Sequence, residues 1–364
     1  MKILGIDTIL HDACAAVVEN GNKVLANVRK HTLMASDNLI NLTLLHSKQL
    51  PLIINSALKE AGVDFKKISL IAVNNFGSFF SNVMVGINAG NLLSQIYDIP
   101  IVGIHHQEAH FFSNWLERDF KEFSFPILVL SSSGGHSSLV LIEDKNFNFL
   151  EISRIEGMEE KSKTKPNFRG IGAVYAFLIN NLKLGGRIES GLLVSKFARG
   201  GNPSRFDFSR PDSAKIFDLN FRWLERKIMK AIFGERRKNG GLSKRFISDI
   251  CASFENSITS IIVNDLLKLV QKFRAKEIHL VGGISANDFL RNKLVKEAKT
   301  QKILARCPRK KEYCTDNAAM IASLGYYKFK QSPKNYLKQR NVEIESNLKL
   351  EKMAIEQKIK RGLC

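Results

Sequence analysis

Short apolar runs separated by turn residues divide the chain into strands that come in groups of three. Each group has two strands joined by a tight turn, such as Asn20-Gly21-Asn22, with a third strand beside them. The predicted groups are 2–7, 13–19 and 23–28, and then 125–130, 137–143 and 149–155. Because the same three-strand arrangement occurs twice, we predict a duplicated fold, although the two copies share almost no sequence identity.

Apolar residues at helical spacing fill most of the remaining chain. The predicted helices are 50–61, 83–97, 105–117, 174–184, 247–273, 287–299 and 318–329. Three further short strands are predicted at 69–73, 101–104 and 277–281. Strands and helices that alternate at these lengths predict an α/β fold with a largely central sheet.

The length of 364 residues fits two domains, or one fold with two similar lobes. We predict an N-terminal lobe over 1–122 and a C-terminal lobe over 123–330, with an inserted basic helical segment at about 205–245. Residues 331–364 have little apolar periodicity, and from Lys334 onward they carry eight basic and four acidic residues. We therefore predict a basic C-terminal tail.

The composition excludes several classes of protein. A hydrophobic fraction of 44% excludes global disorder, and 5 cysteines without a CxxC pair argue against a disulfide framework and favour reduced thiols. No run of 18 uncharged apolar residues occurs and the N-terminus lacks a signal peptide, so no membrane span is expected. The net charge of +20 favours a polyanionic partner, nucleic acid before membranes or phosphorylated metabolites. The alternative is an A/T-rich genome that raises the lysine and asparagine content without a functional reason.

A pair of histidines and a distant aspartate indicate a metal site. His106 and His110 are four residues apart on a predicted helix, so both imidazoles project from one face and can share a metal ion; a pair of surface histidines is the alternative. Gln107 stands where a zinc protease needs glutamate, which argues against a protease. Asp316, before the last predicted helix, is either an N-cap or the third ligand of a site that polarises a carbonyl.

Glycine-rich turns after two strands indicate a nucleotide site. Residues 131–137, Ser-Ser-Ser-Gly-Gly-His-Ser, combine backbone amides that can approach an anion with hydroxyl donors; an ordinary hairpin turn is the alternative. Gly282-Gly283 joins a strand to a helix, and Asn287 is placed to bind a nucleotide hydroxyl; a tight joint is the alternative. Residues 5–8 with His11-Asp12 have the form of a phosphate-contacting turn.

In this order the motifs resemble those of the tRNA threonylcarbamoyladenosine transferase (TsaD-like) family over roughly residues 1–330. The matching segments are His106–His110, Ser133–Ser137 with serine in place of the final threonine, Gly282–Arg291, and Cys314–Ala322, which matches without change. The resemblance implies an actin-like, sugar-kinase-like (ASKHA) α/β fold, duplicated into two lobes with a cleft between them.

The resemblance also implies an activity and its residues. The threonylcarbamoyl group of threonylcarbamoyl-AMP would pass to N6 of the adenosine next to the anticodon, in tRNAs reading codons that begin with A. A divalent metal ion, iron or zinc, would be held by His106, His110 and Asp316. The adenylate would bind across Ser131, Ser132, Ser133, Gly134, Gly135, Gly186 and Asn287.

Asp12 is the best candidate for a general base by its position. Residues 222–245 hold nine basic and two acidic residues, and we expect this segment and the tail to face tRNA. The resemblance further implies a cytoplasmic protein, away from membranes, that acts with a paralogous TsaB-like subunit and an ATPase subunit, or as a homodimer.

The chain departs from the family pattern at several positions. Asp12 replaces a glutamate, Ala176 or a neighbour stands where a substrate-contacting aspartate is expected, and Pro-Gly-Gly is reduced to Leu184-Gly185-Gly186. Three alternatives follow: a divergent transferase of full or reduced activity, a non-catalytic scaffold or tRNA-binding subunit of the same fold, and a small-molecule carbamoyltransferase. The third is considered because residues 11–17 resemble the N-terminus of such carbamoyltransferases. The retained metal residues argue against a scaffold, while 314–322 and the basic charge favour tRNA.

Overall fold

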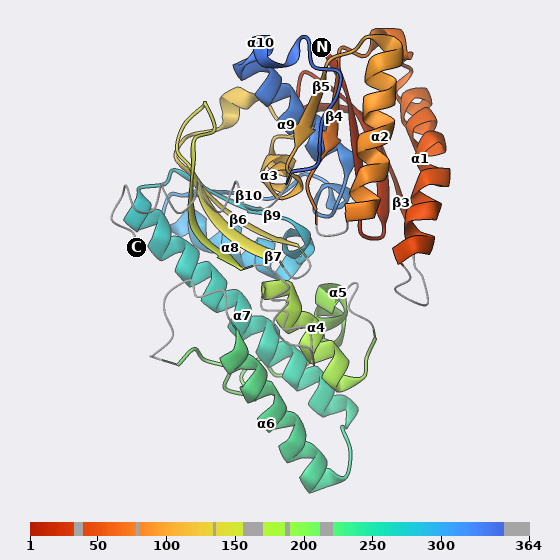
Figure 1. Cartoon of the computed structure of the whole chain (residues 1–364). Coiled ribbons are helices and arrows are strands. Elements are labelled where there is room, and N and C mark those ends of the chain that lie inside the picture. The colour runs from red at the N-terminus through yellow and green to blue at the C-terminus, as the bar shows by residue number, and fades with distance from the viewer. Residues whose placement is uncertain are drawn as a thin grey trace. The chain divides into compact units, whose positions relative to one another are not determined.

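The chain forms two compact units, each built around a five-stranded mixed sheet (Figure 1). This computed structural model describes residues 1–32, 39–77, 80–133, 136–155, 170–185, 190–211 and 221–345. The first unit comprises Met1–Phe123 together with the chain from Pro308 onward, and the second comprises Ser124–Cys307.

In the first unit the sheet has the order β3-β2-β1-β4-β5. Its strands are β1 (Lys2–Ile9), β2 (Asp12–Glu19), β3 (Lys23–His31), β4 (Leu70–Asn74) and β5 (Ile101–Ile104). Strands β1, β4 and β5 are parallel, whereas β2 and β3 continue from β1 as an antiparallel meander. The helices are α1 (Leu39–Ala61), α2 (Phe80–Tyr97), α3 (His106–Phe111), α9 (Ala318–Gln331) and α10 (Pro333–Tyr336).

Both faces of the first sheet are covered by helices. Alternate strand residues such as Leu4 and Ile6 share a core with α1 and α2. On the other face α9 lies so close to β1 that a Cβ at Gly5 would collide with the Ala318 carbonyl oxygen. Strands buried on both faces need apolar residues throughout, and β1 and β2 show this burial pattern.

The second unit repeats this topology with the order β10-β9-β6-β7-β8. Its strands are β6 (Ile127–Ser133), β7 (His136–Ile142), β8 (Phe149–Ile155), β9 (Glu277–Val281) and β10 (Leu304–Arg306). Again three strands form an antiparallel meander, and two further strands add in parallel to the first of them. Its helices are α4 (Ile171–Leu182), α5 (Ser190–Ala198), α6 (Arg222–Asn239), α7 (Lys244–Phe273) and α8 (Asp288–Thr300). The two sheets of like topology agree with the predicted duplication of the fold.

The division between the units differs from the predicted domains. Helix α9 packs on β1, β2 and β4, so the chain from Pro308 to residue 330 belongs with the first unit and not with the predicted lobe 123–330. The start of the predicted tail is also part of this unit. Val342 is 5% exposed in its core, and the Ile101 amide donates to the Gln339 carbonyl. A sequence pattern shows that a segment is buried but not which sheet buries it.

Helix α7 is the longest element of the second unit. Among the described residues it is the one helix whose length and composition would allow it to cross a membrane. However, 67% of its apolar stretch is buried inside the protein, where Phe246, Ile250 and Phe254 join the core of the second unit. The burial identifies α7 as a core helix.

Candidate functional site

Three predicted metal ligands come together at one edge of the first sheet. His106 is the first residue of α3, directly after β5, and His110 follows one helical turn later. Asp316 precedes α9, whose N-cap is Asn317, since the Asn317 side chain accepts from the Met320 amide at 3.1 Å. The alternative role of Asp316 as an N-cap is therefore wrong, and its carboxylate is available to the histidines.

The geometry of these side chains fits a single cation. Nε2 of His106 and Nε2 of His110 lie 3.4 Å and 3.2 Å from Asp316 Oδ1, and the three ligand atoms lie within 4.8 Å of one another. Two ligands at about 2.1 Å from a tetrahedral zinc ion are about 3.4 Å apart. His110 Nε2 and Asp316 Oδ1 are buried, and although they lie 3.2 Å apart they form no well-directed hydrogen bond with each other or with another described residue. A cation would satisfy both atoms.

Asp7 fixes the orientation of one metal ligand. Its Oδ2 is 2.9 Å from His106 Nδ1, and its Oδ1 accepts from Asn74 Nδ2 at 2.8 Å. Asp7 is completely buried on β1, next to β4, whose last residue is Asn74. With Nδ1 held by a carboxylate, Nε2 of His106 is directed toward Asp316 and can act as a ligand.

The buried charges shift the pKa values of all three ligands. Burial disfavours charged His106, but Asp7 and Asp316 outweigh burial and raise its pKa to about 10. Burial dominates at His110 and lowers its pKa. Burial alone would raise the pKa of Asp316, yet the two histidines hold it well below the ordinary value. The ionised Asp316 and the neutral His110 are suitable donors for a divalent metal, whereas His106, whose pKa is raised, must release a proton from Nε2 when a metal binds.

Asp12 lies at the start of β2 and is engaged by two basic side chains. Arg29 donates from Nε to Oδ1 at 2.7 Å and from Nη2 to Oδ2 at 3.2 Å, and His31 Nδ1 is 2.8 Å from Oδ1. Arg29 also donates to Thr315 Oγ1 at 2.6 Å, next to Asp316. The carboxylate therefore anchors Arg29 beside the metal ligands. Its role as a general base stays a prediction, and both of its carboxylate oxygens already have basic partners.

Glu108 lies between the two histidines in sequence but forms an ion pair with a residue outside the candidate metal site. Its Oε2 is 3.0 Å from Lys328 Nζ, so the carboxylate connects α3 to α9. Thr8, next to Asp7, is also used inside the unit: its hydroxyl donates to the Asn82 carbonyl and accepts from the Gly86 amide. Residues 5–8, predicted to belong to a phosphate-contacting turn, lie within β1, where Asp7 orients His106 and Thr8 connects β1 to α2.

The serine motif lies at the carboxyl edge of the second sheet. Ser132 Oγ is 2.8 Å from Ser137 Oγ, which accepts from the Ile171 amide at 3.0 Å. Ser131 pairs with Val281, so the parallel strands β6 and β9 end together. Gly282 follows with φ +75°, and a Cβ there would collide with the Ser132 backbone. Ligands of open α/β sheets bind outside such strand ends.

Asn287 has a structural role in addition to the predicted one. Its Oδ1 caps α8 by accepting from the Leu290 amide at 2.9 Å. Its Nδ2 donates to Glu255 Oε1 at 3.1 Å and to Ser195 Oγ at 3.3 Å, and the Ser195 hydroxyl donates to the same glutamate oxygen. To contact a nucleotide, Asn287 must exchange one of these bonds.

Several predicted adenylate contacts cannot be placed. Gly134, Gly135 and Gly186 lie outside the described residues, as does the side chain of Ser133. Ser131, Ser132 and Asn287 all belong to the second unit. The described part of the predicted nucleotide site is thus distributed over β6 and the start of α8.

Sequence reasoning missed the roles of Asp7 and Glu255. Both are carboxylates within apolar segments, and an acid that interrupts a buried run is a signal that it has a partner. The partner itself, His106 for Asp7 and Asn287 for Glu255, lies 99 and 32 residues away along the chain. Local pattern could have flagged both acids but not paired them.

Comparisons with known proteins agree with the geometry. A family model described as tRNA N6-adenosine threonylcarbamoyltransferase matches residues 43–323. A protein of that name from Caldicellulosiruptor saccharolyticus is 28% identical over 335 residues, covering 90% of this chain and 93% of the relative. Another from Listeria monocytogenes is 28% identical over 345 residues, covering 92% and 93%.

Among solved structures, a ROK hexokinase from Thermus thermophilus is similar with a TM-score of 0.51 and 14% identity, covering 91% of this chain and 100% of that chain. This likeness concerns the fold, and it confirms the predicted actin-like, sugar-kinase-like architecture with a duplicated sheet. The family model matches well over half of the chain. The protein is therefore a member of the tRNA N6-adenosine threonylcarbamoyltransferase family.

Proposed function

We propose that this chain transfers the threonylcarbamoyl group of threonylcarbamoyl-AMP to N6 of the adenosine next to the anticodon, in tRNAs that read codons beginning with A. The observation that carries the proposal is the convergence of His106, His110 and Asp316 in a member of this family. A chain that had become a scaffold would have no physical reason to keep buried ligand atoms without hydrogen-bond partners among the described residues.

The three ligands would hold a divalent metal ion, iron or zinc. Such an ion polarises the carbonyl of the threonylcarbamoyl group as a Lewis acid. Asp7 holds His106 in the orientation that leaves Nε2 for the ion. Arg29, fixed by Asp12 and in contact with Thr315, places a positive charge near the site and favours an anionic substrate there.

The second unit would bind the adenylate part of the donor. Ser131 and Ser132 supply hydroxyls at the end of β6, and the backbone amides of Gly134 and Gly135 are proposed to hold the phosphate. Gly186 and Asn287 are proposed to contact the nucleoside. The family pattern expects an aspartate near Ala176, which this chain lacks at that place. A buried carboxylate is nevertheless present beside Asn287, because Glu255 accepts a hydrogen bond from it.

The reaction is an acyl substitution. The N6 amine of adenosine attacks the carbamoyl carbon, a C–N bond forms, and the C–O bond to the phosphate breaks. AMP leaves with the electron pair, and the amine loses one proton to a base. We propose that Asp12 accepts this proton. The test is the kcat of an Asp12→Asn variant, and an unchanged kcat would assign Asp12 to the positioning of Arg29 alone.

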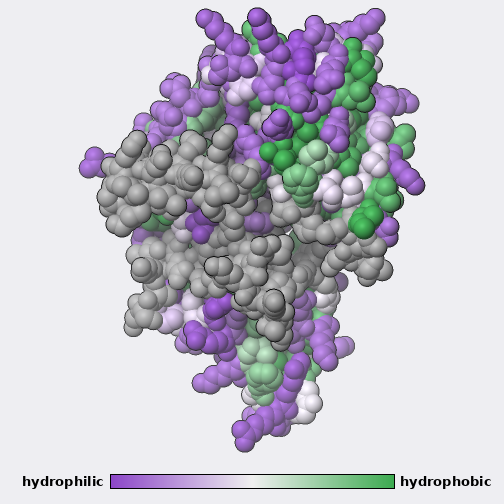
Figure 2. All heavy atoms as spheres, in the orientation of Figure 1, coloured by the Kyte–Doolittle hydropathy of each residue, from purple (hydrophilic) through white to green (hydrophobic). Residues whose placement is uncertain are grey.

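A partner subunit is proposed to dock on α1 and α2. Large apolar side chains are exposed on these adjacent helices, and Figure 2 shows hydrophobic residues among hydrophilic ones on that side. They are Ile40, Leu44 and Leu52 on α1, and Phe80, Leu92, Ile96 and Tyr97 on α2. We propose that a paralogous TsaB-like subunit covers them in the cytoplasm, with an ATPase subunit in the same assembly; a homodimer is the alternative.

The test is the threonylcarbamoyladenosine content of tRNA from cells lacking this protein, measured by nucleoside mass spectrometry after complementation. We expect wild type and the exposed control Asp98→Asn to restore the modified nucleoside, and His110→Ala and Asp316→Ala to fail. The metal content of each purified protein is measured in parallel and should fall in the two ligand variants.

Each alternative predicts a different result. A scaffold retains modification when Asp316 is replaced, because a partner then performs the chemistry. A small-molecule carbamoyltransferase leaves the tRNA nucleosides unchanged in the deletion strain. Full modification by a variant that holds no metal would contradict the role given to the three ligands.

A further inference from the structure

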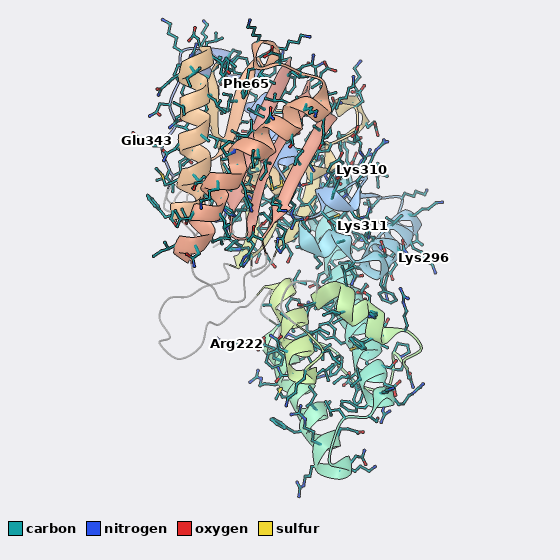
Figure 3. The ribbon with its side chains drawn as sticks, turned by 90° about the vertical axis from the view of Figure 1, so that its right-hand side faces the viewer. Phe65, Arg222, Lys296, Lys310, Lys311 and Glu343 are labelled. Atoms are coloured by element: carbon teal, nitrogen blue, oxygen red, sulfur yellow. The ribbon has the colours of Figure 1, made fainter. Side chains whose placement is uncertain are left out.

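Helix α6 carries a set of cations that the proposed chemistry does not use. The helix begins at Arg222, labelled in Figure 3, and ends at Asn239. Leu224, Ile228 and Ile232 are completely buried and join the core of the second unit, and α6 packs on α4. One face of the helix is therefore packed in the core, and residues on the opposite face are exposed.

Four residues follow one another along that opposite face. Arg226, Lys230, Phe233 and Arg237 are spaced by four, three and four positions, which places them on one stripe of an α-helix. All four are exposed, and Phe233 is 59% exposed. From Arg226 to Arg237 the helix rises by eleven residue steps, about 16 Å. We call these four residues the α6 stripe.

The cations of the stripe have no counter-charge within the described part of the chain. Arg226, Lys230 and Arg237 form no hydrogen bond or ion pair with the described residues. The basic residues beside them differ: Lys227 donates to the Ser209 carbonyl at 2.8 Å, and Arg236 donates to the Asn181 carbonyl at 3.1 Å. Among the described residues, the outward-facing Arg226, Lys230 and Arg237 thus lack the partners that Lys227 and Arg236 have.

We propose that the α6 stripe is a surface on which tRNA docks, with its cations on backbone phosphates and Phe233 stacked on an unpaired base. The inference rests on the proposed function, because it assumes that tRNA is the acceptor. Charge complementarity supports this occupant, since the chain has a net charge of +20 and the stripe is uncompensated. An exposed aromatic ring among cations is typical of surfaces that bind unpaired bases.

A membrane is the less favoured occupant of the same surface. A helix that lies in a bilayer interface needs a broad apolar face directed toward the lipid. Here the apolar face of α6 is buried in the protein core, and Phe233 is the one large hydrophobic residue exposed on the helix. Hydrophilic side chains dominate the surface over α6 in Figure 2.

The experiment measures binding of the full chain, with its partner subunits, to a tRNA that reads a codon beginning with A, over a range of salt concentrations. The variant Arg226→Ala/Lys230→Ala/Arg237→Ala removes the three cations. The matched control removes three exposed lysines of α7 and α8 in the same unit, Lys268→Ala/Lys296→Ala/Lys299→Ala. Thermal unfolding confirms that both variants fold.

In wild type the logarithm of the tRNA association constant should fall linearly with the logarithm of the salt concentration. We expect the steepness of this slope to decrease by about 2 to 3 in the stripe variant, since each phosphate contact contributes about 0.7 to 0.9. The control should change the slope by less than about 1. In the modification assay the stripe variant should raise KM for tRNA and leave kcat unchanged, because it removes binding and not chemistry.

Phe233 is tested separately. Phe233→Leu keeps an apolar side chain but cannot stack, whereas Phe233→Tyr can; we expect Leu to weaken tRNA binding about five-fold or more and Tyr to bind like wild type. Equal binding of the Leu variant and wild type would overturn the stacking role.

The outcomes separate this inference from the proposed function. If wild type neither binds nor modifies tRNA, both are overturned. If wild type binds and modifies tRNA and the stripe variant behaves like its control, the inference alone is wrong. Loss of binding to phosphatidylglycerol vesicles, with tRNA binding unchanged, would also overturn it and assign the stripe to a membrane.

Discussion

The sharpest prediction concerns Asp7, a residue that would not touch the metal ion. In Asp7→Asn the side chain keeps its shape but loses its charge. Asp7 accepts from Asn74 on one oxygen and faces His106 Nδ1 with the other. An asparagine must direct its amide group at one of these two donors, so a buried hydrogen bond is lost whichever way it turns.

The magnitude follows from this geometry. Removing the partner of a metal-bound histidine weakens metal binding about 10- to 100-fold. Asp7 is completely buried, and its contact with His106 is 2.9 Å long, so screening by water is small. We expect a loss near the upper limit, about 2.7 kcal/mol of binding free energy for a 100-fold change.

The assay is competition for Zn²⁺ between the purified protein and a chelating dye of known affinity. Asp98→Asn is the matched control, because it makes the same chemical change at a side chain that is 88% exposed in its ion pair with Arg340. We expect the control to bind zinc like wild type. Zinc affinity of Asp7→Asn within two-fold of wild type, in a protein that unfolds at the wild-type temperature, would refute the positioning role.

Three further predictions concern stability, measured by urea unfolding. Gly5→Ala should destabilise by about 1–3 kcal/mol, because its Cβ meets the Ala318 carbonyl, whereas Gly234→Ala, in open space on α6, should be neutral or stabilising. Val342→Ala should destabilise by about 1.5–3 kcal/mol through lost burial, while the exposed Val295→Ala should change little. Asp249→Asn should destabilise at neutral pH by about 1–3 kcal/mol and make stability less sensitive to acid.

The acid dependence follows from the direction of the Asp249 pKa shift. Burial opposes ionisation, but the Asn202 amide and Arg205 outweigh it, and the pKa is lowered from 3.8 in the folded protein. The stabilisation is therefore present above the unfolded-state pKa and is lost as the pH falls through the lower folded-state pKa. Parallel stability curves for wild type and Asp249→Asn below pH 5 would contradict this account.

A second group of outcomes would contradict the packing predictions. Equal stability of Gly5→Ala and wild type would mean that α9 does not approach β1 as closely as described. Equal stability of Val342→Ala and wild type would mean that residues 339–345 do not form part of the first core.

The sequence by itself determined most elements and identified the candidate metal ligands. Strands 101–104 and 277–281 were predicted with the observed bounds, because a short apolar run between turn signals has few alternatives. The predicted basic helical segment at about 205–245 contains α6, because the helical spacing of its apolar residues can be recognised within the segment itself. His106 and His110 were recognisable together because one helical turn fixes their relative position. The short elements α5 and β10 were missed, since a few residues carry little periodic signal.

Only the tertiary structure decided which distant residues meet. The contact between Asp7 and His106 depends on β1, β4 and β5 lying side by side in parallel, an order set by many weak packing contacts over the whole sheet. The same cause places α9 on the first sheet. Periodicity records that a residue is buried, but the identity of its neighbour is a property of the complete fold, because no local segment contains both partners.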